Sequence, residues 1–437
     1  MNSKSQHILK DLLLIFGFFV MNFSMLCGGN FQLLGPLTLR HLCMAFLFAA
    51  AIFVFYKRGG RYKPSAPKKY FIPFILYLCY LFLYCLFNLI NGEFTTHSFL
   101  QSLYTYHLPC IALIVGLPVL LNSNKKLTFF TYSLILLYLF DVLLTSLQFV
   151  NSSIAWEIAT RISSSAEEGM ADAEMYSNTG DSLLGYSIVA GAFGFVVTNG
   201  YFLATYLPVV THRIYNRKVW DTVLSVALLV VGAVAIFLTQ QRMAFAALLL
   251  YIVFFFWFGF KRKYSIILIL AMILGGLFVL FFKDFNLGRL SAGFNDNTRM
   301  RLFGNFVDFI DSGAFWYGGA VAFLEKYHKA QHNTFLSAWV LGGVFTFVVY
   351  CVLYFNLLWE SVKRIWMHRK NTRLFPYTIS YAVGAALFLF YSITHSAGVQ
   401  SGSPLFWALF MPMLIADRLE RKNVILQRHA LRIKKAV

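Results

Sequence analysis

Repeated apolar runs, each close to the length of a membrane-spanning helix, most constrain what this 437-residue chain can fold into. A helix needs about 20 apolar residues to cross the hydrocarbon core of a bilayer. The runs are continuously apolar and do not alternate, which disfavours a transmembrane β-barrel. The sequence therefore predicts an all-α, polytopic integral membrane protein with about 12 transmembrane helices. The expected spans are residues 10–28, 39–56, 70–90, 103–121, 128–149, 183–210, 221–239, 243–260, 264–282, 335–358, 375–395 and 403–417.

Composition agrees with this fold class. The chain is 59% hydrophobic and 13% charged, whereas soluble domains carry about 25% charged residues. Its six cysteines lie in or beside apolar runs without a CxxC pair, which is typical of small core side chains. Neither a disulfide framework nor a metal site is indicated.

Lysine and arginine are concentrated in every second loop, and this alternation predicts the orientation of the chain. By this rule the basic loops and both termini are cytoplasmic. The net charge of +19 is then mostly a topological signal with a modest attraction to anionic lipids, and nucleic acid is not an expected partner. The basic loops are residues 57–69, 125–126, 213–218, 261–263 and 363–373, together with the C-terminal tail.

Two long loops face the opposite, outer side. Residues 150–182 are acidic, and residues 283–334 form the longest loop. Long loops of this kind are often binding surfaces or lids. Within the second loop, apolar residues recur at helical spacing from Met300 to Ile310, which predicts a short amphipathic helix at the membrane surface. We divide the chain into N-terminal helices (1–182), a core with the large loop (183–347) and C-terminal helices with a basic tail (348–437).

Arginines on the outer side are the first candidates for chemistry. The turn before Arg242 is so short that this residue must lie at the outer membrane surface, and Arg301 lies in the large loop with Arg299 and Arg289 nearby. A guanidinium at headgroup level can grip phosphate oxygens in a bidentate way. A snorkelling or solvated arginine is an equally open interpretation for each residue alone.

A histidine at a loop-to-helix boundary is the second candidate. His332 and Asn333 directly precede an apolar span, and His328 is a weaker candidate four residues earlier. Histidine suits proton transfer because its reference pKa is about 6.5. Most single interface histidines are nevertheless structural. Asp141, inside a span, is either functional or held by a polar neighbour, and both interpretations stay open.

Three segments carry an arginine, an outer-loop helix and a histidine–asparagine pair, in that order along the chain. They are LTQQRMAFAALLL (Leu238–Leu250), TRMRLFGNFVDFIDSGAFWYGG (Thr298–Gly319) and QHNTFLSAWVLGGVFTF (Gln331–Phe347). A Gly/Asn-rich helix lies upstream at Gly191–Val209. In order and spacing these segments resemble one family, the O-antigen ligases and O-antigen polymerases.

The resemblance implies a GT-C-like glycosyltransferase of the bacterial inner membrane. Such a protein takes a glycan from an undecaprenyl-diphosphate carrier at the periplasmic face and joins it to an acceptor without a metal, cofactor or nucleotide sugar. Carried onto this chain, His332 is the base, Arg242 and Arg301 bind the diphosphate, and Asn333 orients the base or the sugar. Arg299, Arg289 and His328 are expected to bind substrate. The partners are the lipid-linked oligosaccharide, the bilayer and a chain-length regulator protein.

Three functions compete. A polymerase uses another carrier-linked repeat unit as the acceptor, and we favour it because Gln241 stands where a small or hydroxyl residue is common and because the N-terminal half is divergent. A ligase uses lipid A–core as the acceptor. A lipid-linked oligosaccharide flippase would instead place its charges inside the membrane on several helices, whereas these arginines cluster at one face.

Overall fold

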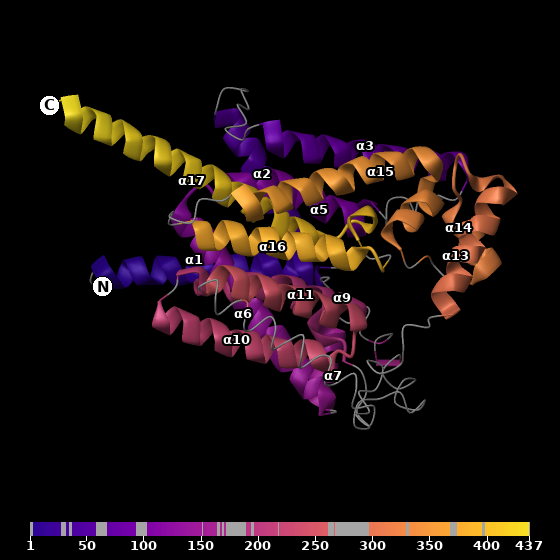
Figure 1. Ribbon diagram of the computed structural model, residues 1–437, viewed down its shortest axis with the longest axis horizontal. Coiled ribbons are helices and arrows are strands. Elements are labelled where there is room, and N and C mark those ends of the chain that lie inside the picture. Colours follow the sequence, from indigo (N-terminus) through magenta and orange to yellow (C-terminus); the bar gives the residue numbers. More distant parts are fainter. Residues whose placement is uncertain are drawn as a thin grey trace.

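The computed structural model of this chain is a bundle of long helices (Figure 1). It describes residues 3–27, 32–34, 37–57, 68–92, 103–150, 152–163, 167, 170–171, 189–193, 196–216, 218–260, 266, 297–328, 331, 333–367, 374–395 and 398–436.

The helices are long and are joined by short 3-10 and π-helical segments. Strands β1 and β2 form a two-stranded antiparallel hairpin. In chain order the elements are α1 (Ser3–Leu26), β1 (Gln32–Leu34), β2 (Leu37–Thr38), α2 (Leu39–Lys57), α3 (Lys68–Ile90), η1 (Leu103–His107), α5 (Leu108–Leu120), α6 (Asn124–Phe149), α7 (Ser153–Ile162), η2 (Gly191–Phe193), α9 (Val196–Val210), η3 (His212–Asn216), α10 (Val219–Leu238), α11 (Arg242–Gly259), α13 (Asn297–Phe309), η5 (Ile310–Ala314), α14 (Ala320–Tyr327), α15 (Thr334–Met367), α16 (Phe375–Ser392), η6 (Val399–Ser401) and α17 (Pro404–Ala436).

Nine helices within the described residues are long and apolar enough to cross a membrane. This confirms the prediction of a polytopic, all-α membrane protein. Of the three other predicted spans, 183–210 is described as a helix from Val196 onward, and 403–417 corresponds to the first half of α17. The span 264–282 lies outside the described residues except for Ile266. The nine are Gln6–Leu26, Leu39–Lys57, Phe71–Ile90, Leu103–Leu120, Asn124–Phe149, Val219–Leu238, Arg242–Gly259, Thr334–Trp366 and Phe375–Ser392.

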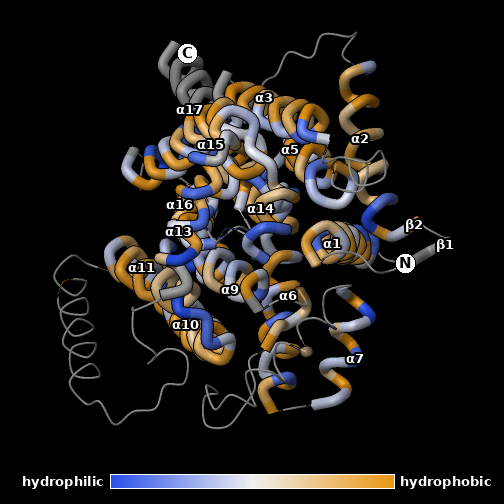
Figure 2. The backbone as a smooth tube through the Cα atoms, turned by 90° about the vertical axis from the view of Figure 1, so that its right-hand side faces the viewer, coloured by the Kyte–Doolittle hydropathy of each residue, from blue (hydrophilic) through white to orange (hydrophobic). Residues whose placement is uncertain are grey.

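The centre of the bundle is formed by α9, α16 and the first half of α17. Nearly all of their described residues are buried, so these segments are surrounded by other helices. In Figure 2, α9 lies inside the bundle, and it packs against α6, α10, α11 and α16. Every residue from Asn199 to Val210 is buried.

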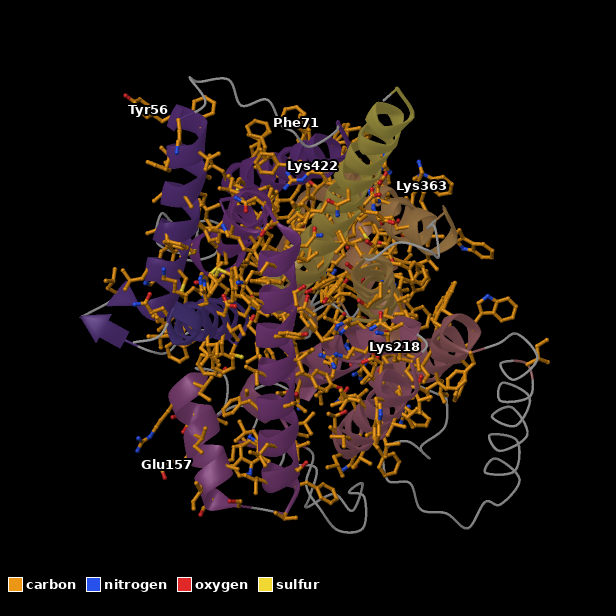
Figure 3. The ribbon with its side chains drawn as sticks, turned by 90° about the vertical axis from the view of Figure 1, so that its left-hand side faces the viewer. Tyr56, Phe71, Glu157, Lys218, Lys363 and Lys422 are labelled. Atoms are coloured by element: carbon orange, nitrogen blue, oxygen red, sulfur yellow. The ribbon has the colours of Figure 1, made fainter. Side chains whose placement is uncertain are left out.

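Helices at the periphery expose apolar side chains at helical spacing, as expected of surfaces that face lipid. Tyr56 and Phe71 lie at the edge of the bundle in Figure 3, and the exposed fraction of Tyr56 is 83%. Along α15 the exposed residues recur every three or four positions, which marks one face of the helix. They are Phe345, Val348, Val352, Phe355 and Trp359.

The two ends of the bundle differ. Helix α1 begins and helix α17 ends at the same end of the bundle, and α13 and α14 lie at the opposite end (Figure 1). Lys125, in a predicted cytoplasmic loop, pairs with Asp11 of α1 at 2.7 Å, so it lies near the start of the chain. We call the end that carries α13 and α14 the outer end and the opposite one the inner end, after the sidedness predicted from the charges.

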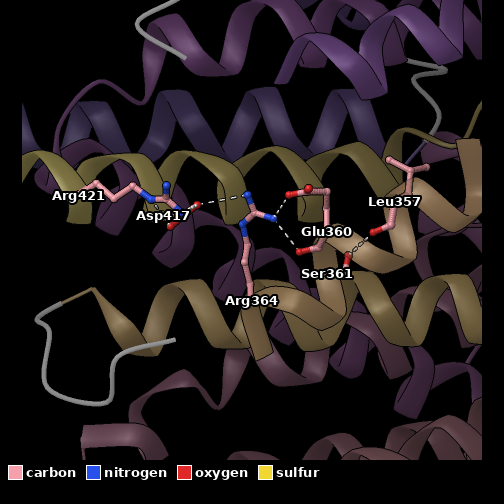
Figure 4. Close-up of polar contacts among 6 residues, drawn as sticks. All are labelled: Leu357, Glu360, Ser361, Arg364, Asp417 and Arg421. Carbon is pink, nitrogen blue, oxygen red and sulfur yellow. Dashed lines mark hydrogen bonds and ion pairs between the residues drawn. The ribbon is translucent and has the colours of Figure 1, made fainter. Parts of the chain in front are cut away.

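An ion-pair network joins α15 to α17 near the inner end (Figure 4). The Arg364 guanidinium, 6% exposed, donates to Glu360 at 2.6 Å and to Asp417 at 3.2 Å. Arg421 donates to the same aspartate at 3.0 and 3.1 Å from the more exposed side. Buried charges are tolerated when they are paired in this way, so the network fixes the two long helices to each other.

Asp141 is held by polar neighbours near the outer end of α6. Its carboxylate accepts a hydrogen bond from Ala192 N–H at 2.7 Å. When the Asn199 amide turns its nitrogen toward Asp141, it also donates to the carboxylate at 2.8 Å. Gln148, two turns along α6, accepts from Gly191 N–H at 2.8 Å. Of the two interpretations left open by the sequence, these bonds favour a clamp that ties η2 and α9 to α6.

Candidate active site at the outer end

Arg242 is the first residue of α11 and follows a tight turn from α10. The turn closes because Thr239 Oγ1 accepts from Gln241 N–H at 3.3 Å while its own hydroxyl donates to Ile236 O at 2.7 Å. Gln240 adopts a left-handed φ of 53°, which is strained for a residue other than glycine. A cation at a helix N-terminus is unfavourable for the helix dipole, so the partly buried Arg242 stands where an anion would relieve that cost.

The segment around the predicted base is held on both sides. Gln331 is buried, and its Nε2 donates to Leu302 O of α13 at 2.8 Å. Asn333 caps α15: its Oδ1 accepts from Phe335 N–H at 2.9 Å and from Leu336 N–H at 3.1 Å. These two bonds are those of an ordinary helix N-cap. His332 itself lies outside the described residues.

The other predicted site residues belong to the outer-loop helices. Arg301 is exposed in the second turn of α13, next to the Leu302 carbonyl that binds Gln331. Arg299 is part of α13, but its side chain lies outside the described residues, as does the whole of Arg289. His328 ends α14 in a left-handed conformation, with a φ of 55° and an exposed side chain.

The predicted amphipathic helix from Met300 to Ile310 is confirmed as α13, which ends at Phe309. The chain then turns at Gly313, whose φ is 100°, and returns as α14. The two helices have a small apolar core of their own with the first turns of α15, and we call α13, η5 and α14 the outer platform. This core consists of Phe306, Phe309, Phe323 and Val340.

The outer platform is fixed to α15 where that helix is broken by two glycines. Gly343 has a φ of 71° and a ψ of −169°, a combination essentially limited to glycine. A Cβ on Gly343 would overlap the Trp316 carbonyl group and lie 2.5 Å from Tyr317 N, so two backbones cross in contact here. On the other segment of this crossing, residues 316–319, a Cβ on Gly318 would lie 2.5 Å from Val340 O.

Backbone groups released by the break in α15 find new partners in this crossing. Val344 N–H donates to Phe315 O at 3.0 Å, and Gly319 N–H donates to Val340 O at 2.8 Å. From α3, Asn88 Nδ2 donates to Leu341 O at 2.7 Å. Because buried backbone groups must be paired, these bonds fix the outer platform, and with it Arg301, against the start of α15.

A buried polar cluster lies under the start of α15. The Thr334 hydroxyl bonds both Gln400 Oε1 of η6 and the Tyr350 hydroxyl. Tyr80 of α3 donates to Gln400 O at 3.0 Å. A Cβ placed on Gly398 would lie 2.7 Å from Thr334 Oγ1 and 3.2 Å from Ser392 Cβ, so the end of α16 joins the same cluster.

The end of α16 also reaches the start of α11. A Cβ placed on Gly200 of α9 would lie 2.9 Å from the Tyr391 hydroxyl and 3.3 Å from Gln241 Cγ. The side chain next to Arg242 and the last turn of α16 therefore both approach Gly200. Arg301 is connected to the start of α15 through Leu302 and Gln331, and Arg242 follows a residue that packs on Gly200 beside Tyr391.

Several residues of this region were not singled out from the sequence. Gln331, Gln400 and Tyr391 carry contacts that join the elements, but single polar residues in a chain with 24 tyrosines give little signal. The i, i+4 spacing of Tyr391 and His395 does indicate a shared helix face. Among the described residues, no group of three or more His, Cys, Asp or Glu side chains gathers in a way that could hold a metal ion.

Residues 227–351 match the family model described as O-antigen ligase. The matched range contains all three motif segments quoted above and leaves out the upstream helix at 191–209, so it supports the predicted O-antigen ligase and polymerase family over that part of the chain. No curated protein matches the chain.

Proposed function

We propose that this chain transfers a glycan from an undecaprenyl-diphosphate carrier to an acceptor hydroxyl, and the match of residues 227–351 to the family model described as O-antigen ligase supports this. The reaction takes place at the outer end of the bundle, on the periplasmic side of the bacterial inner membrane. The acceptor that we propose is a second carrier-linked repeat unit, which makes the protein an O-antigen polymerase.

The observation that carries the proposal is the hydrogen bond from Gln331 Nε2 to Leu302 O at 2.8 Å. It joins the residue before His332 to the residue after Arg301. A base and an anion ligand must both reach one sugar carbon, whose leaving group is the diphosphate. This bond supports that requirement because it couples the two segments directly.

The proposed roles follow the flow of charge. As the C1–O bond breaks, its electron pair passes to the diphosphate, and the guanidinium groups of Arg242 and Arg301 stabilise the growing charge with help from Arg299. The acceptor oxygen forms the new bond to C1, and its proton passes to the His332 imidazole. The Asn333 carbonyl oxygen is occupied as a helix cap, so its amide nitrogen is the atom left to orient sugar. Arg289 and His328 contact substrate at the margin.

Height in the membrane also supports this arrangement. The carrier's polyprenyl tail stays in lipid, so its diphosphate lies at headgroup level. Arg242 begins a membrane span, and α15 begins directly after Asn333. Ligands at these helix starts would meet the diphosphate without moving it into the hydrocarbon core. A chain-length regulator protein would act on the same outer face.

The test uses purified full-length protein, a carrier-linked repeat unit and EDTA. Longer lipid-linked glycans support the polymerase. His332→Ala and Arg242→Ala should each lower the rate by at least about a hundredfold, the size of effect expected for a lost base or charge stabiliser. Arg161→Gln is the matched control, because Arg161 is an exposed arginine of α7 whose ion pair within the described part of the chain is with Glu157. Equal rates for all three variants would contradict the assigned roles.

A ligase is the second candidate, because the matched family is described as O-antigen ligase. Product that forms only when lipid A–core is added would establish it. A transporter would move the lipid-linked glycan without joining it and would be indifferent to His332→Ala. No product with either acceptor would contradict glycan transfer.

A further inference from the structure

Two neighbouring tyrosine hydroxyls at the outer end have no hydrogen-bond partner among the described residues. Tyr201 lies in the second turn of α9 and Tyr391 in the last turn of α16, and both are buried. Their rings are in contact, with centroids 3.9 Å apart at an angle of 38°. A buried hydroxyl without a partner costs about 1–3 kcal/mol, so two side by side require an explanation.

Most other buried tyrosines in the same bundle do not share this property, and Tyr215 of η3 is a buried exception. The others donate to a defined acceptor or share a hydrogen bond with another polar side chain, as burial normally requires. Burial in the bundle therefore does not by itself leave a hydroxyl unpaired. The paired examples are Tyr77 with His107, Tyr80 with Gln400 O, Tyr206 with Leu405 O, Tyr354 with Leu389 O and Tyr381 with Thr131.

The position of the unpaired hydroxyls relates them to the proposed diphosphate site. The Tyr391 hydroxyl lies against the bare backbone of Gly200, and Gln241, the neighbour of Arg242, contacts the same glycine. His395 is partly exposed and contacts both tyrosine rings, at centroid distances of 5.3 Å and 6.1 Å. It therefore lies beside the pair at a position that is partly open to the surface.

We propose that Tyr201 and Tyr391 bind the hydroxyl groups of the donor sugar that is bonded directly to the diphosphate, with His395 at the rim of this subsite. The proposal rests on the proposed glycan transfer. If Arg242 holds the diphosphate, the sugar bonded to that diphosphate lies near Gln241 and Gly200. A tyrosine hydroxyl both donates and accepts, which matches a sugar hydroxyl, whereas a phosphate oxygen only accepts. Gly200 leaves the space that a side chain would otherwise take from the Tyr391 hydroxyl.

The test compares Tyr391→Phe and Tyr201→Phe with a matched control, Tyr206→Phe. Tyr206 lies in the same helix as Tyr201, and its hydroxyl donates to Leu405 O of α17 at 2.8 Å. Without substrate, the two subsite variants should keep or raise the melting temperature, because they remove an unpaired buried group, and Tyr206→Phe should lower it. In glycan transfer, each subsite variant should lose about tenfold in kcat/KM, the value of one or two hydrogen bonds, while Tyr206→Phe keeps the wild-type rate.

Each outcome decides between the inferences. If wild-type protein joins glycans and Tyr391→Phe equals it, the subsite is wrong and the proposed function stands. If both subsite variants lose stability as Tyr206→Phe does, their hydroxyls are structural and the subsite is also wrong. If the wild-type protein joins no glycans, the subsite is tested by binding instead. The shift in melting temperature caused by undecaprenyl diphosphate is compared with the shift caused by the glycan-bearing carrier. An extra shift from the glycan that Tyr391→Phe abolishes supports the subsite, and no extra shift overturns it.

Discussion

Replacing Gly343 by alanine should detach the outer platform from α15 without unfolding the bundle. The new Cβ would overlap the Trp316 carbonyl group, and the glycine-only backbone conformation would be strained by about 1–3 kcal/mol. Neither side can yield easily, because both contacting parts are backbone. Relief requires the crossing to open, which breaks the bonds from Val344 N–H to Phe315 O and from Gly319 N–H to Val340 O.

The expected magnitude follows from these terms. Two backbone hydrogen bonds contribute about 0.5–1.5 kcal/mol each, so the variant should weaken docking of the platform by about 2–6 kcal/mol. Even the lower bound raises the open population about thirtyfold. The transmembrane core is separate from the small core of the platform, so the melting temperature of the bundle should change little. Glycan transfer should fall, because Arg301 leaves the start of α15 together with α13.

Hydrogen–deuterium exchange of full-length protein in nanodiscs measures this directly. Peptides covering residues 315–328 should exchange at least about thirtyfold faster in Gly343→Ala, while peptides of α16 keep the wild-type rate. Gly304→Ala is the matched control: it lies in α13 with open space around it, and alanine favours helix by up to about 1 kcal/mol. Wild-type exchange in Gly343→Ala would refute the close crossing of the two backbones.

Three further outcomes follow from the described contacts. Asp417→Ala should lower the free energy of unfolding by about 1.5–3 kcal/mol, since it removes a charged hydrogen bond from the buried Arg364 guanidinium. Arg421→Ala, at a side chain 57% exposed, should change it by about 0–1 kcal/mol, and thermal melts compare the two variants. Burial lowers the pKa of His212, in η3 outside the spanning helices, to about 4. The unfolded chain has a His pKa of about 6.5 and therefore binds a proton at a higher pH than the folded protein does, so stability falls by up to about 3 kcal/mol from pH 7 to pH 4. The difference in melting temperature between wild type and His212→Gln should shrink over that range. A constant difference would contradict the lowered pKa. Asp141→Ala should cost about 1–3 kcal/mol because Ala192 N–H loses its buried acceptor, and Asp141→Asn, which keeps an acceptor oxygen, should cost measurably less.

The sequence predicted what depends on solvent and periodicity. The apolar runs located nine spans of the described chain, and the spacing from Met300 to Ile310 located α13, because each pattern reports directly which face meets water, lipid or protein. It also located Arg242 at the start of a helix and the helix that begins after Asn333. Which helices pack against each other could not be predicted, because apolar helix faces carry no complementary charge pattern that would identify their partners.

Contacts that join the site were beyond prediction for a related reason. The two glycines at 342–343 were predicted to lie in a helix. The segment that crosses them, residues 316–319, is identified only by the three-dimensional structure. Gln331 was quoted within a motif, but its bond to the Leu302 carbonyl uses a backbone atom that any residue supplies. Likewise, the sequence does not show that the Tyr391 hydroxyl has no partner among the described residues, because this depends on how the bundle packs.

The different construction of the two ends favours a transferase over a transporter. A transporter must open each end in turn, and opening the inner end along α15 and α17 would separate the Arg364 guanidinium from a carboxylate while it remains mostly buried. Losing the charged hydrogen bond between Arg364 and Asp417 costs about 1.5–3 kcal/mol, and a transporter would meet a cost of this kind in every cycle. A transferase that works at the outer face needs no such step. Asp417→Asn in proteoliposomes should therefore lower stability without raising translocation of the lipid-linked glycan, and faster translocation with unchanged joining would favour the transporter.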